Sequence, residues 1–358
     1  MRIYNYDRGL RTRVAAMAIA MLIVSACSAN NSTPAPVATP SSPTASPSAI
    51  VLAATPTDTP APSGLYTRPS TVAQPMFVET RGAAAGTTEP VTVTIAAAGD
   101  IACDPKQNVG TPKDCDQAAT ADLLGQLHPT AVLTLGDNQY EDNAYQAYLD
   151  VYDKTWGAYK DITFPTIGNH EYLTQDAAGY FKYFGFPAYY SFDLGNWHIV
   201  SLNSECHFVG GCNKNSPQER WFLADLAAHP NLCTMVMWHE PRWSSGEHQD
   251  ATQMDTIWKD LVAANVDVVL TGHNHDYERF QPLNAAGRPD PKGTPEFVVG
   301  TGGKNHYGFV VPPLPGEVVR DQNSFGVISM TLTSDGYSWR FVDAPGYTFT
   351  DTGTATCH

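Results

Sequence analysis

The sequence predicts an α/β fold, and three observations lead to this prediction. From about residue 88, apolar runs of strand length alternate with segments of helical pattern, which is typical of a sheet connected by helices. The last quarter of the chain is mostly strand-like runs and turns, so we expect more strands there. Hydrophobic residues make up 42% of the 358 residues and charged residues 16%, which suffices for a large buried core.

The elements follow one another in a regular order. Strands are predicted where β-branched and aliphatic residues form short runs, and helices where apolar residues recur at helical spacing. The expected strands are 91–98, 131–135, a short one ending at 166, the pair 189–192 and 197–202, 233–237, 266–270, 296–300, 325–333 and 337–342. The expected helices are 118–127, 145–156, 216–228 and 252–265. The third helix has the strongest start signal, because Ser216 is a capping residue, Pro217 follows it and Glu219 comes three residues after the cap.

The N-terminal residues 1–26 predict a lipoprotein signal peptide. Four arginines lie within residues 1–13, and an unbroken apolar run of 11 residues follows at 14–24. That run is too short to span a bilayer of about 30 Å but has the layout of a secretory signal. Small residues precede Cys27, which resembles the bacterial lipobox, where the cysteine carries a lipid. We expect an exported protein anchored to the outer side of the cytoplasmic membrane or to the cell surface; a plain signal peptide is the alternative.

Residues 27–87 predict the lipidated cysteine followed by a disordered linker. Residues 28–64 hold eight prolines, many Ser, Thr and Ala residues and a single charged residue, Asp58. A segment of this composition cannot bury enough apolar surface to offset the entropy of ordering it. The linker is therefore interpreted as a tether.

The six cysteines after Cys27 predict disulfides, because an even number is typical of exported proteins. Two short loops favour pairing Cys103 with Cys115 and Cys206 with Cys212. This leaves Cys233 and Cys357 as the third pair, which would attach the C-terminal residues to a core strand.

The net charge limits the partners. The formal charge is −15 at pH 7, and so acidic a surface repels nucleic-acid phosphates and anionic lipid headgroups. We therefore expect no nucleic-acid partner and no membrane contact except through the lipid. An anionic substrate would have to be attracted by a local positive charge such as a metal ion. The sequence leaves the oligomeric state open.

Polar residues that can bind metal follow five of the expected strands. Because the carboxyl ends of strands in an α/β sheet form its ligand site, these residues should converge. Each one alone could be a turn, cap or core residue, but five such coincidences are improbable. Their mixed oxygen and nitrogen donors suit Fe, Mn or Zn, and a carboxylate among them can bridge two ions. The residues are Asp100, Asp137, Asn169, His239 and the pair His273 and His275.

Four strings around these residues resemble the motifs of the purple acid phosphatases, which belong to the calcineurin-like metallophosphoesterases. They are GDNQY at 136–140, GNHE at 168–171, WHEP at 238–241 and GHNHDYER at 272–279. The resemblance covers roughly residues 92–342. It implies one catalytic domain, residues 88–345, with the four-layer α/β/β/α sandwich of the metallophosphoesterases. Residues 346–358 would form a C-terminal tail.

The resemblance also implies a role for each motif position. The ligands of a first metal ion would be Asp100, Asp137, Tyr140 and His275. Asp137 would bridge to a second ion, whose other ligands would be Asn169, His239 and His273. His170 would not bind metal but would lie over the substrate as an acid or charge stabiliser. Glu171, Glu240, Arg242, Trp243, Tyr277 and Arg279 are candidates to line or support the substrate pocket.

The first motif departs from the pattern of the purple acid phosphatases, because Ala102 stands where they usually have glycine. Other metallophosphoesterases have a histidine ligand at this position, and alanine cannot bind metal. Tyr140 then becomes the natural fourth protein ligand, although it could instead be a packed aromatic residue. A phenolate is a hard anionic donor, so we expect Fe(III) beside it and Fe(II), Zn or Mn in the second position.

The expected function is hydrolysis of phosphate monoesters by in-line attack of a metal-bound hydroxide, as in an acid phosphatase. His170 would protonate or stabilise the leaving alkoxide. A phosphodiesterase using the same site is one alternative. A non-catalytic surface lipoprotein that binds metal is another.

Overall fold

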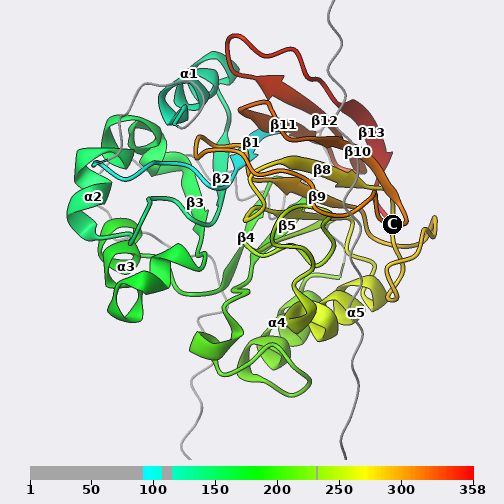
Figure 1. Ribbon diagram of the computed structural model, residues 1–358. Helices are drawn as coiled ribbons and strands as arrows, with labels where there is room; N and C mark the ends of the chain where they lie inside the picture. The colour runs from blue at the N-terminus through cyan, green and yellow to red at the C-terminus, as the bar shows by residue number, and fades with distance from the viewer. Residues whose placement is uncertain (1–91, 107–114, 231–232) are drawn as a thin grey trace, which may run out of the picture. The chain divides into compact units, whose positions relative to one another are not determined.

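The computed structural model describes residues 92–106, 115–230 and 233–358, and these contain all the elements named below. They form two β-sheets with helices on both sides, the mixed α/β arrangement that the sequence predicts (Figure 1). Within these residues, no helix is both long and apolar enough to cross a membrane. The expected signal peptide, the lipid site at Cys27 and the linker lie outside the described residues.

The first sheet has six strands in the order β13-β12-β11-β1-β2-β3. Its strands are β1 (Val93–Ala98), β2 (Ala131–Leu135), β3 (Thr163–Thr166), β11 (Gly326–Leu332), β12 (Gly336–Asp343) and β13 (Thr352–Thr356). β1, β2 and β3 are parallel, and the other three add to β1 as an antiparallel meander. The carboxyl ends of β1, β2 and β3 therefore meet at one edge of this sheet.

The second sheet has seven strands in the order β10-β8-β9-β7-β6-β5-β4. Its strands are β4 (Tyr190–Leu194), β5 (Trp197–Ser201), β6 (Cys233–Met237), β7 (Val268–Thr271), β8 (Tyr277–Phe280), β9 (Glu296–Val299) and β10 (Glu317–Asp321). β5, β6, β7 and β9 are parallel to one another. Their carboxyl ends form the second edge on which a site can be built.

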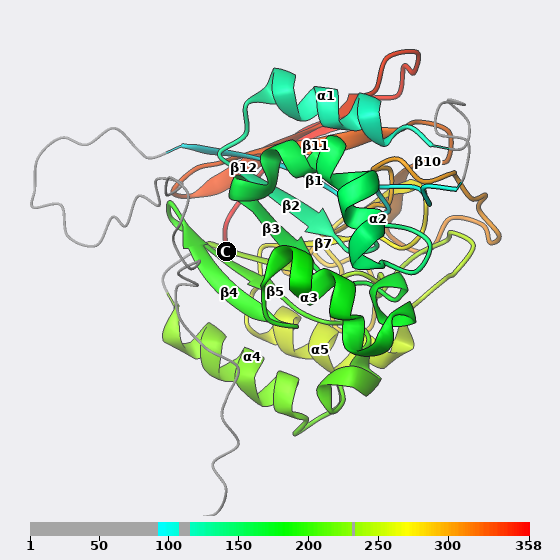
Figure 2. The same ribbon diagram turned by 90° about the vertical axis from the view of Figure 1, so that its left-hand side faces the viewer.

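The helices cover the two sheets in the four-layer order of a metallophosphoesterase-type sandwich (Figure 2). α1 (Gln117–Leu127) lies over the six-stranded sheet, and α4 (Pro217–Ala228) and α5 (Asp255–Ala263) lie over the seven-stranded sheet. Two shorter helices, α2 (Tyr145–Asp150) and α3 (Ala178–Phe184), pack against each other beside β3.

The alternation of side chains along β6 shows how the layers are held together. Met235 and Met237 belong to the core cluster shared with the first sheet, whereas Val236 belongs to the cluster formed with α4 and α5. Because successive side chains of a strand point to opposite faces, one apolar strand can fill both cores. Trp221 and Trp258 complete the second cluster from the helices.

The expected helix at 145–156 is wrong in its second half. α2 ends at Asp150, and the 3-10 helices Tyr152–Lys154 and Trp156–Ile162 follow it. The backbone N–H of Tyr152 donates to the Gln139 side chain, 3.1 Å away, instead of to the helix carbonyl four residues back. The expected helix at 252–265 likewise begins with a 3-10 turn, Thr252–Met254, before α5.

Three disulfides join Cys103 to Cys115, Cys206 to Cys212 and Cys233 to Cys357, which is the expected pairing. The residues set apart in the sequence as a tail, 346–358, contribute β13 to the first sheet. Cys357 directly follows this strand, whereas Cys233 begins β6 of the second sheet. The third disulfide therefore links the two sheets.

Candidate metal centre

The seven predicted metal ligands lie together at the carboxyl ends of strands from both sheets. Asp100, Asp137 and Asn169 follow β1, β2 and β3, while His239 and His273 follow β6 and β7. Strand direction alone brings these residues to one place, although the first and the last of the seven, Asp100 and His275, are far apart in sequence.

Tyr140 lies at the middle of a first group of donors. Its hydroxyl oxygen is 2.8 Å from Asp100 Oδ1, 2.9 Å from Asp137 Oδ2 and 3.0 Å from His275 Nε2. His275 Nε2 is also 3.4 Å from Asp100 Oδ1. Four donor atoms this close to one another match the set expected for the first metal ion.

His239 lies at the middle of a second group. Its Nε2 atom is 3.0 Å from Asn169 Oδ1, 3.2 Å from His273 Nδ1 and 3.4 Å from Asp137 Oδ1. Asp137 therefore turns one oxygen to each group, as a bridging carboxylate does. Asp137, His239 and His273 can between them hold a metal ion.

The two buried histidines are held in the tautomer that metal binding requires. The Nδ1 atom of His239 contacts the Leu135 carbonyl oxygen at 2.7 Å, and Nδ1 of His275 contacts the Asn305 carbonyl oxygen at 2.5 Å. A carbonyl can only accept, so each Nδ1 carries the proton and each Nε2 presents a lone pair to the centre. The donor set thus fits a pair of metal ions.

The charged groups of the centre shift the pKa values of one another. Burial alone would raise the pKa of Asp137, but His239, His170 and His273 hold it far below its usual range. Burial, with the charges of Asp100 and Asp137, raises the pKa of Tyr140 well above its ordinary value. A phenolate at this position therefore depends on a nearby cation.

The backbone at this edge is strained where the ligands leave their strands. Asp100, Asp137 and His273 have φ values of 60°, 48° and 69°, in the left-handed region. A residue other than glycine in this backbone conformation lowers the stability of the fold by about 1–3 kcal/mol, and such strain is commonly found at functional sites. A Cβ atom at Gly168 would lie 2.4 Å from Asp137 Oδ1, so only glycine allows the close approach of the β3 loop.

Glu171 was expected to border the pocket, but it is fully buried beneath the centre. Its carboxylate accepts hydrogen bonds from the backbone N–H groups of Asp137, Asn138 and Gly168, at 3.0, 2.8 and 2.6 Å. Burial and the charge of Asp137 raise the pKa of Glu171 to about 7, while the hydrogen bonds from Asn138 act in the opposite direction. Glu171 thus joins the loop after β2 to the loop after β3.

His170, the predicted acid or charge stabiliser, lies beside Asp137 and is partly exposed. Its Nε2 atom is 3.9 Å from Asp137 Oδ2, and 23% of its side chain is exposed. Its Nδ1 atom contacts the Glu141 carbonyl oxygen at 2.5 Å, which fixes the ring. The ring centroid is 4.5 Å from that of Tyr140. A proton on Nε2 would point toward a group bound at the centre.

Two aromatic side chains beside the centre were missed in the sequence. The His248 ring centroid is 4.5 Å from that of His273, and Tyr307 stacks on His275 at 4.0 Å. Burial, and then the charge of His275, lower the pKa of His248. The Ser-Ser-Gly string at 244–246, shortly after His239, is the sequence signal that the chain can turn back toward the site at this point.

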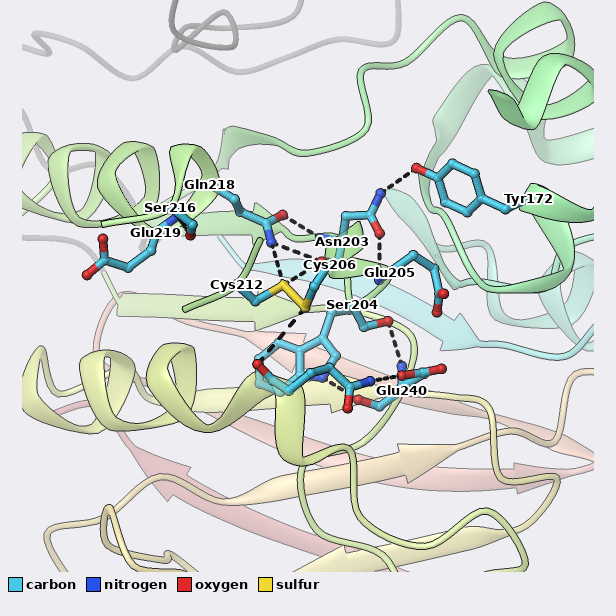
Figure 3. Close-up of a disulfide and its surroundings, with 12 residues drawn as sticks. Tyr172, Asn203, Ser204, Glu205, Cys206, Cys212, Ser216, Gln218, Glu219 and Glu240 are labelled. Atoms are coloured by element: carbon cyan, nitrogen blue, oxygen red, sulfur yellow. Dashed lines mark hydrogen bonds between the residues drawn. A yellow bond between two sulfur atoms is a disulfide. The ribbon is translucent and has the colours of Figure 1, made fainter. Parts of the chain in front are cut away.

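Glu240, another pocket candidate, lies close enough to His239 of the second donor group for the two to interact electrostatically. Burial and the neighbouring Glu205 raise the pKa of Glu240 to about 8, and His239 opposes this shift. Glu205, which was not predicted, directly precedes the loop that the Cys206–Cys212 disulfide closes (Figure 3). Asn203 orders this loop, because its side chain accepts from the Glu205 N–H and donates to the Tyr172 hydroxyl, both at 2.8 Å.

The other pocket candidates are engaged elsewhere. Arg242 is buried, stacks on Trp243 at 3.7 Å and pairs with Asp255 at 2.6 Å. Tyr277 and Arg279 both donate to Asp351, at 2.7 Å each. The structure thus places Arg242, Tyr277 and Arg279 in networks that support strands and loops rather than at the centre.

The comparison with known families agrees with this geometry. The calcineurin-like phosphoesterase family model matches residues 93–277, just over half of the chain. This chain belongs to the calcineurin-like phosphoesterase family. The match begins at β1 and ends at the first residue of β8, so it includes all seven candidate ligands.

Several curated members of the family that resemble the chain are purple acid phosphatases. Purple acid phosphatase 18 of Arabidopsis thaliana is 27% identical over 266 residues, which is 65% of this chain and 55% of that protein. Purple acid phosphatase 22 of the same plant is 33% identical over 147 residues, covering 38% and 32%. Human acid phosphatase type 7 is 28% identical over 233 residues, covering 53% and 52%. The chain thus spans about half or less of the length of these relatives.

Two solved structures share the fold of this chain. The purple acid phosphatase from yellow lupin seeds superposes with a TM-score of 0.63 at 17% identity, over 75% of this chain and 54% of that chain. GAP50, described as the anchor in the inner membrane complex of Plasmodium, superposes with a TM-score of 0.57 at 13% identity, over 75% and 89%. The two-sheet sandwich predicted from the motifs is confirmed.

Proposed function

We propose that this calcineurin-like phosphoesterase is a metal-dependent hydrolase of phosphate monoesters, similar to the acid phosphatases. The observation that carries the proposal is the position of Asp137, whose two oxygens face the two donor groups at 2.9 and 3.4 Å. The purple acid phosphatases among its relatives support the same activity. The substrate is a small phosphate ester.

The proposed cofactor is a pair of metal ions. The hard donors Asp100, Asp137 and Tyr140 favour Fe(III) in the first position. The second position, with Asn169, His239 and His273, suits Fe(II), Zn or Mn. When bound, such a pair lowers the pKa of water and neutralises charge on the phosphoryl oxygens.

The chain's own residues complete the site. His170 is held by the Glu141 carbonyl, so its Nε2 atom can carry a proton toward the leaving oxygen of a bound ester. Glu171 fixes the loops on which Asp137 and Asn169 sit. Since the chain carries a net charge of −15, the cations would also supply the attraction that an anionic ester needs.

Asp137→Asn tests the bridging role. An amide cannot offer an anionic oxygen to both donor groups, so we expect metal content to fall and hydrolysis of p-nitrophenyl phosphate to drop by about 10³-fold or more, about 4 kcal/mol of barrier. Asp122→Asn, on the exposed face of α1, is the matched control and should keep the metal content and the hydrolysis rate of the parent. Hydrolysis at the parent rate in Asp137→Asn would exclude the proposal. Faster cleavage of bis-p-nitrophenyl phosphate by the parent would reassign the site to diesters.

Tyr140→Phe tests the metal identity. A tyrosinate bound to Fe(III) gives a visible charge-transfer band, so the iron-loaded parent should be coloured and Tyr140→Phe should lose the band. Tyr307→Phe is the matched control, because Tyr307 stacks on His275 but its hydroxyl is not among the donors. A band that persists in Tyr140→Phe would rule out the tyrosinate ligand.

A further inference from the structure

A second cluster of histidines and carboxylates lies at the opposite end of the seven-stranded sheet. His198 on β5 pairs in register with Thr234, near the start of β6, whereas His239 of the metal centre follows the end of β6. Asp193 lies on β4, and His229 follows the last turn of α4. The proposed phosphatase mechanism uses none of these residues.

Two carboxylates hold the His198 ring. Its Nδ1 atom is 2.8 Å from Asp193 Oδ1 and its Nε2 atom is 2.8 Å from Asp225 Oδ2. Asp225 is fixed in turn, because its other oxygen accepts from the Ser191 hydroxyl at 2.9 Å. His198 and Asp225 are both buried, whereas 38% of the Asp193 side chain is exposed.

His229 supplies a second ring to the same cluster. Its Nδ1 atom contacts the Asp225 carbonyl oxygen at 2.8 Å, so Nδ1 carries the proton and Nε2 has a free lone pair. The ring stacks on His198 with centroids 3.8 Å apart. One donor atom from each of Asp193, His198 and His229 lies within 4.8 Å of the other two.

This arrangement has the outer partners of a metal site already in place. Metal-binding histidines commonly donate their other N–H to a carboxylate or a backbone carbonyl, which orients the ring and fixes the tautomer. Asp225 provides a carboxylate for His198 Nε2 and a carbonyl for His229 Nδ1. The remaining nitrogen of His198, Nδ1, faces Asp193 at 2.8 Å, and the remaining nitrogen of His229 is Nε2.

We propose that Asp193, His198 and His229 form a binding site for a divalent cation of the Zn²⁺ type, separate from the catalytic pair. One carboxylate and two imidazoles with a fourth position for water is a common zinc donor set. The cation would replace the proton that His198 Nδ1 shares with Asp193, and that proton leaves to solvent. Ligands of one zinc ion lie about 3.3 Å apart, so the partly exposed side chains of Asp193 and His229 turn inward on binding.

A cation at this site would stabilise the edge of the seven-stranded sheet that β4 forms. β4 is the last strand of the seven-stranded sheet, and edge strands need protection from fraying and from pairing with other chains. Asp193 and His198 belong to the β4–β5 hairpin, whereas His229 belongs to the end of α4. The ion would join the edge hairpin to the helix that covers it.

The test is zinc stoichiometry of the purified full-length chain and two variants. Each protein is equilibrated with Zn²⁺ at micromolar free concentration, separated from unbound metal and measured by elemental analysis. We expect the parent to keep one more zinc ion per chain than His229→Ala or Asp193→Asn. Both changes are at partly exposed side chains, so the variants should fold. His207→Ala, which removes an exposed histidine outside the cluster, should match the parent.

Two further measurements make the result unambiguous. Zinc should raise the melting temperature of the Asp137→Asn protein, and the same addition should have less effect when His229→Ala is combined with it. Rates with p-nitrophenyl phosphate should be unchanged in His229→Ala. Equal zinc content and equal melting shifts with and without His229 would overturn the proposal and leave the cluster as a histidine ion-paired with two aspartates. Because the comparison does not depend on turnover, failure of the phosphatase assignment would be seen separately.

Discussion

Glu171 positions the metal centre without entering it. Its two oxygens together accept hydrogen bonds from the backbone at Asp137, Asn138 and Gly168, and the Asn138 side chain adds another at 3.0 Å. These donors belong to the loops after β2 and β3, which carry the bridging carboxylate and Asn169. One buried carboxylate thus sets the spacing between two ligands that lie 32 residues apart in the sequence.

Glu171→Gln should separate this positioning role from a pocket role. The amide group would face N–H donors, leaving buried groups unpaired at a cost of about 3 kcal/mol. We expect a lower free energy of unfolding in urea together with loss of metal affinity. The exposed Glu247, changed to Gln, is the control and should alter neither. Wild-type stability in Glu171→Gln would contradict the role assigned to the carboxylate.

Individual residues differ in how far sequence alone can place them. The seven ligand candidates could be predicted because each follows a strand directly or belongs to a short motif there, and strand direction fixes where it ends. His248 could not, because it lies well along the loop that follows β6, and Glu205 could not, because it follows β5 closely but belongs to none of the four motifs. Tyr277 and Arg279 belong to a motif, yet both donate hydrogen bonds to Asp351, which lies far along the chain and could not be paired with them from the sequence.

Among the elements, those with apolar runs bounded by polar residues were predictable, whereas α3, β8, β10 and β13 were not expected. The runs at β1, β2, β6 and β11 have only one reasonable interpretation, since they are buried and bounded by polar residues. β10 is only five residues long and largely half-buried, so it has no apolar pattern to detect. Where α2 gives way to the first 3-10 helix, the Gln139 side chain accepts the Tyr152 N–H, and this contact between residues 13 apart has no local signature in the sequence.

The disulfides connect elements in two different ways, and their removal should have different effects. The Cys233–Cys357 bridge closes a loop of 124 residues, and Cys206–Cys212 closes one of 6. The chain-entropy model gives about 5 and about 2 kcal/mol of stabilisation for loops of these lengths. Replacing Cys233 and Cys357 by Ala should therefore lower the melting temperature more.

For substrate binding we expect the opposite order, with the larger effect on removal of the Cys206–Cys212 bridge. Glu205 directly precedes Cys206 (Figure 3) and interacts electrostatically with His239 of the second donor group. Replacing Cys206 and Cys212 releases the loop that begins there, so KM for p-nitrophenyl phosphate should change. The Cys233–Cys357 bridge lies at the other end of β6, so its loss should leave KM unaltered at temperatures where the protein is folded. The same KM in all three proteins would show that the loop has no part in substrate binding.

For the molecule as a whole, we propose export and lipid attachment at Cys27, which lies outside the described residues. The support is the sequence alone: arginines, a short apolar run and small residues before the cysteine. In a bacterial host, Cys27→Ser should move the protein from the membrane fraction to the soluble fraction. Ser28→Ala is the control and should remain in the membrane fraction. Parent protein found only in soluble fractions would disprove the anchor.

The two sheets are fastened to each other at both ends of β6. The covalent Cys233–Cys357 bond is at its start, and the candidate ligands from both sheets meet just past its finish. Elsewhere the sheets are held together by apolar packing and by hydrogen bonds, such as the one between the Thr166 and Ser201 hydroxyls at 3.0 Å and the one from the Tyr190 hydroxyl to the Pro165 carbonyl oxygen at 3.0 Å. With metal ions in the proposed centre, a chelator would therefore remove one of the two links at the ends of β6 while the disulfide keeps the sheets joined. Adding the ions back should restore the original arrangement.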